Sequence, residues 1–414
     1  MIQQSTDVAV IGAGPAGMMC ALKAAEKGLN TVIIDPNRLC GRKLRITGKG
    51  RCNVTNNCDA NEFLKNICRE GKFLRSALQK FGPADTISFF EALNVPLKTE
   101  RGNRVFPVSD NANDIADALV SELQRKKCRV IRDRVTDIIT ENGEITSVAL
   151  ADGGKLACKA VVIASGGMSY PKTGSDGYGY KLAARFGHTV VPPRPALVPV
   201  VCEGNFFEEL QGLSLRNVDL SLFKDGKCIR KERGELLFTH FGLSGPLVLS
   251  ASSLMDASAG AEYSFAIDLK PALDEETLDK RILRDFELFK NKELKNSLGK
   301  LMPLSLVPVV IEKSGIAPDT PVNSVTREER RRLLSVIKGF DLNITGLRPI
   351  DEAIVTAGGV NVKEVNPRTM ESKLQKHLYF AGEVLNIDGF TGGFNLQVAW
   401  TTGFVAGSSV ETEE

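Results

Sequence analysis

Val8-Ala-Val-Ile-Gly12-Ala-Gly14-Pro-Ala-Gly17 decides how this chain folds. A short apolar run, typical of a buried parallel strand, leads directly into a glycine-rich turn and then into residues that predict a helix. Thr31–Ile34 predicts a second strand, and Asp35 follows it 23 residues after Gly12. This order of strand, turn, helix and strand predicts a Rossmann-type nucleotide-binding domain of the α/β class.

The three glycines of this motif have different roles in such a domain. Gly12 permits the tight turn, Gly14 lets the backbone approach a pyrophosphate, and Gly17 allows the helix to pack closely on the strand. Asp35 can accept hydrogen bonds from ribose hydroxyls and would repel a 2′-phosphate, which disfavours NADP here. A turn with only a packing role is the alternative. We expect cofactor contacts from Gly12, Ala13, Gly14, Pro15, Ala16, Gly17, Asp35 and Pro36.

Three further segments favour FAD over NAD at this site. A β-hairpin pattern at 144–158 and an apolar strand at 160–164 lead into Ser165-Gly-Gly167, as in flavoproteins. Near the C-terminus, a strand closes on Gly382-Glu383, the kind of pair that approaches the ribityl chain. A glycine-rich helix start at Gly393 could direct its dipole at the flavin N1–O2 edge. The expected contacts are Val135, Ala164, Ser165, Gly166, Gly382, Glu383, Gly393, Asn395 and Leu396.

A basic segment with little periodicity follows the second strand, at residues 37–60. A long loop of this kind is usually functional, so we expect it to cover the FAD pyrophosphate or to attract an anionic substrate. A solvated basic loop is the alternative. Cys52 lacks a partner at the spacing of flavin disulfide reductases, which favours a buried or flavin-packing thiol. The cofactor contacts expected from this loop are Arg42, Lys43, Arg51, Cys52 and Asn53.

The character of the sequence changes near Pro192-Pro-Arg-Pro195. Short β-like runs follow, and then a charged helical stretch, in which Thr326 and Glu329 form a capping-box pattern. The nucleotide-binding pattern returns after Gly346. We therefore predict a discontinuous FAD-binding domain, with its first part at 1–194 and its second at 346–414. Residues 195–345 form an inserted module whose helical portion spans about 271–340.

Candidate catalytic residues lie in Thr239-His-Phe-Gly-Leu-Ser244-Gly-Pro246. His240, one of three histidines, could act as a general acid or base, and Ser244 lies beside it. A hydrogen-bonded structural histidine is the alternative for His240. The serine segment is not a G-x-S-x-G nucleophile elbow. His188 follows a helix end, so we expect a cap or a surface position.

Composition limits the classes of partner. The chain has 414 residues, 43% hydrophobic residues and a formal net charge of +3, which predicts a folded protein with no nucleic-acid partner. No apolar stretch is long enough to span a bilayer. Nine cysteines and no export signal predict a cytoplasmic protein, and three histidines with no C-x-x-C predict no metal site. The oligomeric state is left open.

Several longer motifs resemble the BaiN-like, or aminoacetone-oxidase-like, family of FAD-dependent oxidoreductases. They span nearly the whole chain, and the 41–56 block is highly specific. Lys49 stands where glycine is often seen, and Asp35 where glutamate is more common. The resemblance implies a Rossmann-type FAD domain, discontinuous in sequence, with an inserted β-barrel and helical module, but it leaves the substrate open. The matching segments are 41–56, 105–110, 238–246, 356–360 and 382–403.

These observations predict an FAD-dependent oxidoreductase that moves a hydride between the flavin and a small organic substrate. An amine-type oxidase and an NAD(P)H-dependent reductase both remain open. No second G-x-G-x-x-G follows a strand, which favours either transient binding of NAD(P)H or O₂ as the electron acceptor. The alternatives are a flavin-containing nucleic-acid-modifying protein and an FAD-binding protein without turnover.

Overall fold

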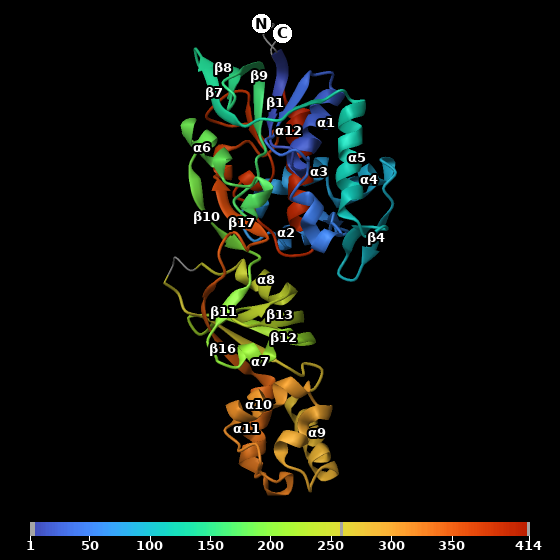
Figure 1. Ribbon diagram of the computed structural model, residues 1–414, viewed down its shortest axis with the longest axis vertical. Helices are drawn as coiled ribbons and strands as arrows, with labels where there is room; N and C mark the ends of the chain where they lie inside the picture. The colour runs from blue at the N-terminus through green and yellow to red at the C-terminus, as the bar shows by residue number, and fades with distance from the viewer. Residues whose placement is uncertain (1–4, 257–259, 412–414) are drawn as a thin grey trace. The chain divides into compact units, whose positions relative to one another are not determined.

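The computed structural model describes residues 5–256 and 260–411. The chain forms two compact units, Met1–Ala196 with Pro349–Glu414, and Leu197–Arg348 (Figure 1). The predicted divisions after residues 194 and 345 lie two and three residues before those of the structure. The first unit is therefore made of two segments that are distant in the sequence.

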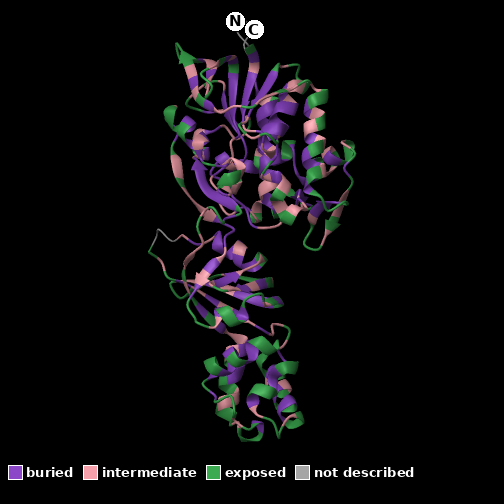
Figure 2. Ribbon diagram, in the orientation of Figure 1, coloured by how far each residue is buried: buried purple, intermediate pink, exposed green. Residues whose placement is uncertain are grey.

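A seven-stranded sheet forms the centre of the first unit, in the order β6-β2-β1-β9-β8-β7, with β18 beside β9. Strands β1, β2, β6, β9 and β18 are parallel, and β7 and β8 add an antiparallel hairpin. Val8, Val10 and Val162 are fully buried, because the middle strands are covered on both faces (Figure 2). The strands are β1 (Ser5–Ile11), β2 (Thr31–Ile34), β6 (Arg129–Ile131), β7 (Val135–Glu141), β8 (Glu144–Leu150), β9 (Lys155–Ile163) and β18 (Leu378–Phe380).

Helix α1 (Pro15–Glu26) packs on α12 (Phe394–Ser409), although the two are far apart in the sequence. A Cβ at Gly403 would lie 2.4 Å from the Ala16 carbonyl oxygen, and one at Gly407 would lie 2.2 Å from that of Cys20. Only glycine permits such an approach of two helix backbones. The other helices of this unit are α2 (Ala60–Lys65), α3 (Arg75–Lys80), α4 (Pro83–Ala92), α5 (Ala112–Arg125) and α6 (Tyr178–Arg185).

Two small sheets complete the first unit. One contains three antiparallel strands in the order β3-β5-β4, and the other pairs β10 with β17. Their strands are β3 (Thr55–Asn56), β4 (Leu97–Glu100), β5 (Arg104–Pro107), β10 (Val190–Ala196) and β17 (Val355–Val360). Both sheets contain motif segments, since β3 ends the basic loop and β17 carries the 356–360 block.

The second unit is a closed barrel in the order β11-β14-β13-β12-β15-β16, with a helical module between β15 and β16. One buried cluster runs from the barrel residue Phe265 to Ile282 and Leu333 of the helices. The predicted α/β domain with an inserted β-barrel and helical module is confirmed. The elements are β11 (Val200–Cys202), α7 (Phe207–Leu210), β12 (Ser214–Lys224), β13 (Lys227–Thr239), β14 (Gly242–Ser244), α8 (Pro246–Ser252), β15 (Tyr263–Asp268), α9 (Glu275–Leu288), α10 (Val307–Ser314), α11 (Arg327–Lys338) and β16 (Phe340–Leu347).

Short 3₁₀ helices connect these elements. They are η1 (Leu44–Gly50), η2 (Gly71–Leu74), η3 (Pro171–Thr173), η5 (Leu294–Asn296), η6 (Leu298–Lys300), η7 (Leu304–Leu306), η8 (Val322–Ser324), η9 (Val362–Glu364) and η10 (Gly382–Val384). In residues 5–256 and 260–411, no helix has the length and apolar character to cross a membrane. Over the same ranges, no cluster of three His, Cys, Asp or Glu side chains is arranged to hold a metal ion.

The α1–α12 contact gives a stability prediction. Replacing Gly403 with Ala places a methyl group against the Ala16 carbonyl and should cost about 2 kcal/mol of unfolding free energy. The clash opposes the better helix propensity of alanine, which is worth about 1 kcal/mol. Gly346→Ala is the control, because no atom lies within 4 Å of its added Cβ. Denaturant unfolding should show the loss only for Gly403→Ala, and equal midpoints for both variants would contradict the prediction.

Candidate functional site

The turn between β1 and α1 has the geometry of a pyrophosphate site. Gly12 has a φ of +108°, and a Cβ there would lie 2.5 Å from the Ala164 carbonyl oxygen. A Cβ at Gly17 would lie 2.0 Å from the Gly12 oxygen. At Gly14, in contrast, no atom lies within 4 Å of an added Cβ, and no side chain caps α1, which begins at Pro15. This open, uncapped helix start fits the diphosphate of FAD.

The predicted residues after β9 lie beside this turn. Ala164 N donates to the Ile11 carbonyl at 2.9 Å, so the ends of β1 and β9 meet there. Ser165 and Gly166 follow, with a φ of +77° at Gly166. Val135 begins β7, pairs with Leu150 and has a fully buried side chain.

Asp35 connects the end of β2 to the same turn through hydrogen bonds. Its Oδ2 accepts from Ala13 N at 2.7 Å, and its Oδ1 accepts from the backbone and side-chain nitrogens of Asn37 at 2.7 and 3.0 Å. An ionised carboxylate offers about four acceptor positions. Three are used here, so one remains for a ribose hydroxyl. Pro36 directs the chain away from the strand into the basic loop.

The structure brings Lys43 and Glu383 together. Lys43 Nζ lies 2.8 Å from Glu383 Oε2 and donates to Ser169 Oγ at 2.6 Å. Glu383 Oε1 accepts from Thr356 N at 2.7 Å and from Ser169 Oγ at 3.1 Å. Both charged residues were predicted from the sequence, but not as a pair. Ser169 and Thr356 were missed as partners, although Thr356 lies in the 356–360 block.

The loop after Arg51 packs closely against the start of α12 and forms hydrogen bonds with it. A Cβ at Gly393 would lie 2.4 Å from the Thr55 carbonyl oxygen, so this approach also requires glycine. With its amide oriented to satisfy its neighbours, Asn53 accepts from Gly393 N at 3.0 Å and donates to the Val105 carbonyl at 3.2 Å. Asn53 therefore acts on the helix start through the backbone.

Two buried side chains of α12 complete this connection. Trp400 Nε1 donates to the Val54 carbonyl at 2.9 Å, and Thr55 Oγ1 donates to Gln397 Oε1 at 2.6 Å. Gln397 is fully buried, and its amide nitrogen donates to Thr401 Oγ1 at 3.0 Å. The sequence analysis missed Gln397 and Trp400. A buried glutamine on an apolar helix was the available signal, because such a group requires a hydrogen-bond partner.

Asn395 and Leu396 have contacts within the protein. Asn395 Oδ1 accepts from Gly389 N at 2.9 Å and its Nδ2 donates to Gly389 O at 2.8 Å, so this side chain shapes the loop before α12. Leu396 packs against the core while remaining partly exposed. A direct cofactor contact by either side chain stays a prediction. Gly382, with a φ of +78°, opens the 3₁₀ turn that presents Glu383.

Arg51 and Arg42 bind protein groups as well. Arg51 pairs with Glu100 and Asp110, each at 2.5 Å, and its guanidinium lies 4.2 Å from the centre of the Phe106 ring. These two carboxylates raise the pKa of Arg51, and the Arg51 contact holds that of Glu100 below its usual range. Arg42 is exposed and donates to Asn37 Oδ1 at 3.2 Å. Their predicted contacts with FAD remain predictions.

Cys52 is fully buried with a left-handed backbone, φ +59°. Burial raises the pKa of its thiol to about 12, so the sulfur is protonated at neutral pH. A protonated thiol is a poor nucleophile. This environment favours the packing interpretation of Cys52 over a redox one.

The candidate catalytic residues lie in the second unit. His240 is exposed on the turn between β13 and β14, with its ring 4.9 Å from that of Phe241. Ser244 ends β14, and its backbone pairs with Leu237. The prediction for His188 is confirmed as a helix cap and wrong as a surface position. Its backbone N donates to the Ala183 carbonyl at 3.3 Å just after Gly187, whose φ is +82°, and this bond caps the end of α6. His188 is buried, bonds to Ser372 Oγ at 2.7 Å, and has its pKa lowered by burial.

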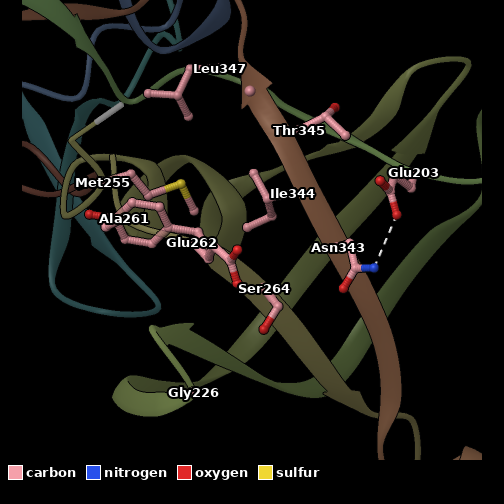
Figure 3. Close-up of a pocket in the computed structure, with 12 residues that line it drawn as sticks. Glu203, Gly226, Met255, Ala261, Glu262, Ser264, Asn343, Ile344, Thr345 and Leu347 are labelled. Atoms are coloured by element: carbon pink, nitrogen blue, oxygen red, sulfur yellow. Dashed lines mark hydrogen bonds between the residues drawn. The ribbon is translucent and has the colours of Figure 1, made fainter. Parts of the chain in front are cut away.

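A cavity of about 620 Å³ opens on the barrel between β15 and β16 (Figure 3). Its walls combine apolar groups such as Tyr263 and Ile344 with polar ones, among them Asn343, which donates to Glu203 at 3.0 Å. Neither His240 nor Ser244 lines it. This cavity and the predicted catalytic residues are therefore separate features of the second unit.

Relatives of known name cover nearly the whole chain. It is 33% identical over 398 residues to the ribosomal RNA dihydrouridine synthase of Escherichia coli, with 96% of each chain covered. It is 30% identical over 410 residues to the 3-dehydro-bile acid delta(4,6)-reductase of Clostridium scindens, covering 97% of this chain and 98% of the relative. The resemblance drawn from the motifs is thus confirmed.

A solved structure shares the fold at low identity. The 3-ketosteroid delta1-dehydrogenase of Sterolibacterium denitrificans aligns over 98% of this chain and 99% of its own, with a TM-score of 0.51 and 14% identity. The family model of the HI0933-like protein Rossmann domain matches residues 6–409. The chain therefore belongs to the HI0933-like family and is an FAD-dependent oxidoreductase.

Proposed function

We propose that this enzyme reduces a carbon–carbon double bond conjugated to a carbonyl group, with NAD(P)H as the transient electron donor. The observation that carries this proposal is the chemistry common to the names of two full-length relatives. A delta(4,6)-reductase of a 3-oxo steroid acts on double bonds conjugated to that ketone. Forming dihydrouridine adds two hydrogens to the C5=C6 bond of uridine, which is conjugated to the C4 carbonyl.

Uridine in ribosomal RNA is the first candidate substrate, because the relative of that name is 33% identical and matches over 96% of both chains. This choice departs from the prediction of a small substrate without nucleic acid, which rested on the low net charge and on the lack of a basic-aromatic stripe in the sequence. A small enone is the second candidate, favoured by the relative from Clostridium scindens. Neither relative is named for the oxidation of an amine, so we favour a reductase over an amine oxidase.

We assign the cofactor contacts from the geometry of the first unit. The Gly12–Gly17 turn and the start of α1 would hold the diphosphate, and Asp35 the adenosine ribose. Glu383, with Lys43 beside it, would meet the ribityl hydroxyls. The start of α12 at Gly393 would face the N1–O2 edge, where its dipole favours negative charge. When bound and reduced, FAD would supply the hydride needed at the carbon β to the carbonyl.

The reaction also needs a proton at the carbon α to the carbonyl. His240 is the proposed donor, through a ring nitrogen, because imidazole exchanges protons near neutral pH. Ser244 would hydrogen-bond the substrate or relay the proton. Both lie at the β13–β14 end of the barrel, six and two residues before Pro246 opens α8.

The overall function is tested by anaerobic reduction and product analysis. The FAD-loaded protein should be bleached by NADH or NADPH, and its flavin colour should return on adding an oxidised acceptor. Protein-free ribosomal RNA from a strain lacking dihydrouridine and a steroid dienone are the two acceptors to compare, with mass spectrometry of the product. Dihydrouridine formation supports the first candidate and reduction of the dienone alone supports the second. Failure of both acceptors to reoxidise the flavin would contradict the reductase proposal.

Gly14→Val tests the nucleotide site. The backbone at Gly14 has a φ of −78°, which valine adopts readily, and the added Cβ meets no protein atom within 4 Å. The variant should therefore fold but lose FAD affinity on the order of 100-fold, because the side chain occupies the place of the diphosphate. Flavin absorbance per protein after desalting measures this loss. Gly346→Val, at another open position, should retain FAD, and retention by Gly14→Val as well would refute the assignment.

His240→Ala tests the proton donor. Loss of a general acid should lower turnover about 100-fold or more while leaving the rate of flavin reduction by NAD(P)H unchanged. Stopped-flow measurement of the two half-reactions separates these effects. Ser244→Ala should give a smaller loss in the same half-reaction. An unchanged reoxidation rate in His240→Ala would make this exposed histidine a structural residue.

A further inference from the structure

The helical module of the second unit contains an aromatic ring with two ammonium groups close to it. Phe289 follows α9 and is partly exposed, with Lys292 Nζ 4.8 Å and Lys300 Nζ 5.3 Å from its ring centre. Phe289 and Lys292 follow the end of α9, which Figure 1 labels, and Lys300 is the last residue of η6. We call Leu288, Phe289, Lys292, Lys300 and Leu304 the Phe289 patch.

Positive charge in this patch is not neutralised within the protein. Lys290 and Lys295, its neighbours in the sequence, lie 3.4 Å from Glu287 and 3.0 Å from Glu293. Among the residues that the structure describes, no carboxylate lies within 4.0 Å of Lys292 or Lys300. The two cations that flank the ring are thus left for an external anion.

The patch is also unusually apolar for a charged surface. Leu304 is 75% exposed and Leu288 is 64% exposed, more than any other large apolar side chain in the described part of the chain. Helix α9 buries Leu278, Ile282 and Phe286, and Phe289, three residues after Phe286, continues this face to the surface beyond the end of the helix. Large apolar side chains that are exposed to this degree indicate an interaction site in this module.

Contacts beneath the surface hold the two halves of the patch together. Arg281 donates through Nε to the buried carboxylate of Asp285 at 2.8 Å and through Nη2 to the Lys300 carbonyl at 3.3 Å. Lys292 N donates to the Phe289 carbonyl at 2.8 Å. Because a hydrogen bond joins α9 to the 298–300 turn, the patch is already formed before any partner binds. A preformed surface loses little entropy on binding.

We propose that the Phe289 patch binds a single-stranded segment of RNA, with a base stacked on Phe289 and Leu288 or Leu304 beside it, and with phosphates paired to Lys292 and Lys300. Single-stranded RNA is recognised by this combination of an aromatic platform and uncompensated cations. A protein partner would need two acids placed around an apolar group, whereas RNA repeats its phosphate and base along the chain. The proposal rests on ribosomal RNA as the substrate, and it adds a contact outside the residues assigned to the reaction.

Charge reversal of the two lysines tests the proposal in the FAD-loaded protein. Lys292→Glu/Lys300→Glu should bind protein-free Escherichia coli ribosomal RNA at least about tenfold more weakly, measured by filter binding over a series of KCl concentrations. Removing two phosphate contacts with a single strand should also reduce the steepness of log affinity against log salt by about 1.4. Lys155→Glu/Lys181→Glu is the charge-matched control, with two exposed lysines of the first unit. It should keep the affinity and the slope of the unchanged protein.

Phe289→Leu is the second variant, since it keeps an apolar side chain on the packed side and removes the stacking surface. It should weaken RNA binding about tenfold with little change in salt slope, and an unchanged melting temperature would verify folding. If the unchanged protein and both patch variants bind RNA equally, the patch is not the RNA-binding site. The proposal that ribosomal RNA is the substrate is not affected by that result. RNA binding that depends on the patch, without dihydrouridine formation, would instead overturn the proposed substrate. Equal weakening in the Lys155/Lys181 control would also reject the patch as the specific contact.

Discussion

The close contact between α1 and α12 is the constraint on which the first unit depends. Two glycines of α12 let its backbone approach the Ala16 and Cys20 carbonyls, so the last helix lies against the helix that follows the nucleotide turn. The same helix anchors residues 53–55 through Trp400 and Gln397. One packing contact therefore aligns three separate segments of the site: the first turn, the basic loop and the start of α12.

Much of this arrangement could be predicted from the sequence. The Gly12–Gly17 turn, Asp35 and an inserted module of strands and helices follow from local patterns whose physical causes act over a few residues, whereas the barrel was implied by the family resemblance. The capping box of α11 is another example, because Thr326 Oγ1 accepts from Glu329 N at 3.2 Å and Glu329 Oε2 accepts from Thr326 N at 2.8 Å. A pattern of this length contains both partners of its hydrogen bonds, so it can be predicted from the local sequence.

Other side chains could not be placed in this way, because their partners come from distant segments. Arg51 meets Glu100 and Asp110, and Lys43 meets Glu383, which follows it by 340 residues. His188 contacts Ser372 and Phe380, which are distant in the sequence, so the residues around it could not predict its burial. The net charge of +3 is a sum over all 414 residues and says nothing of where the charges lie. It therefore did not indicate the two lysines without a carboxylate partner beside Phe289.

The split of the first unit has a consequence for the order in which the protein matures. Residues 197–348 form a complete unit with its own core, and ribosomes finish it before they make the segment that carries Glu383 and α12. Domains generally fold as units during synthesis. The barrel can therefore fold on the nascent chain, while the first unit waits for its final segment, with its apolar α1 surface unprotected. Assembly of the flavin site is then one of the last events in biosynthesis, and a chaperone that shields α1 would act in that interval.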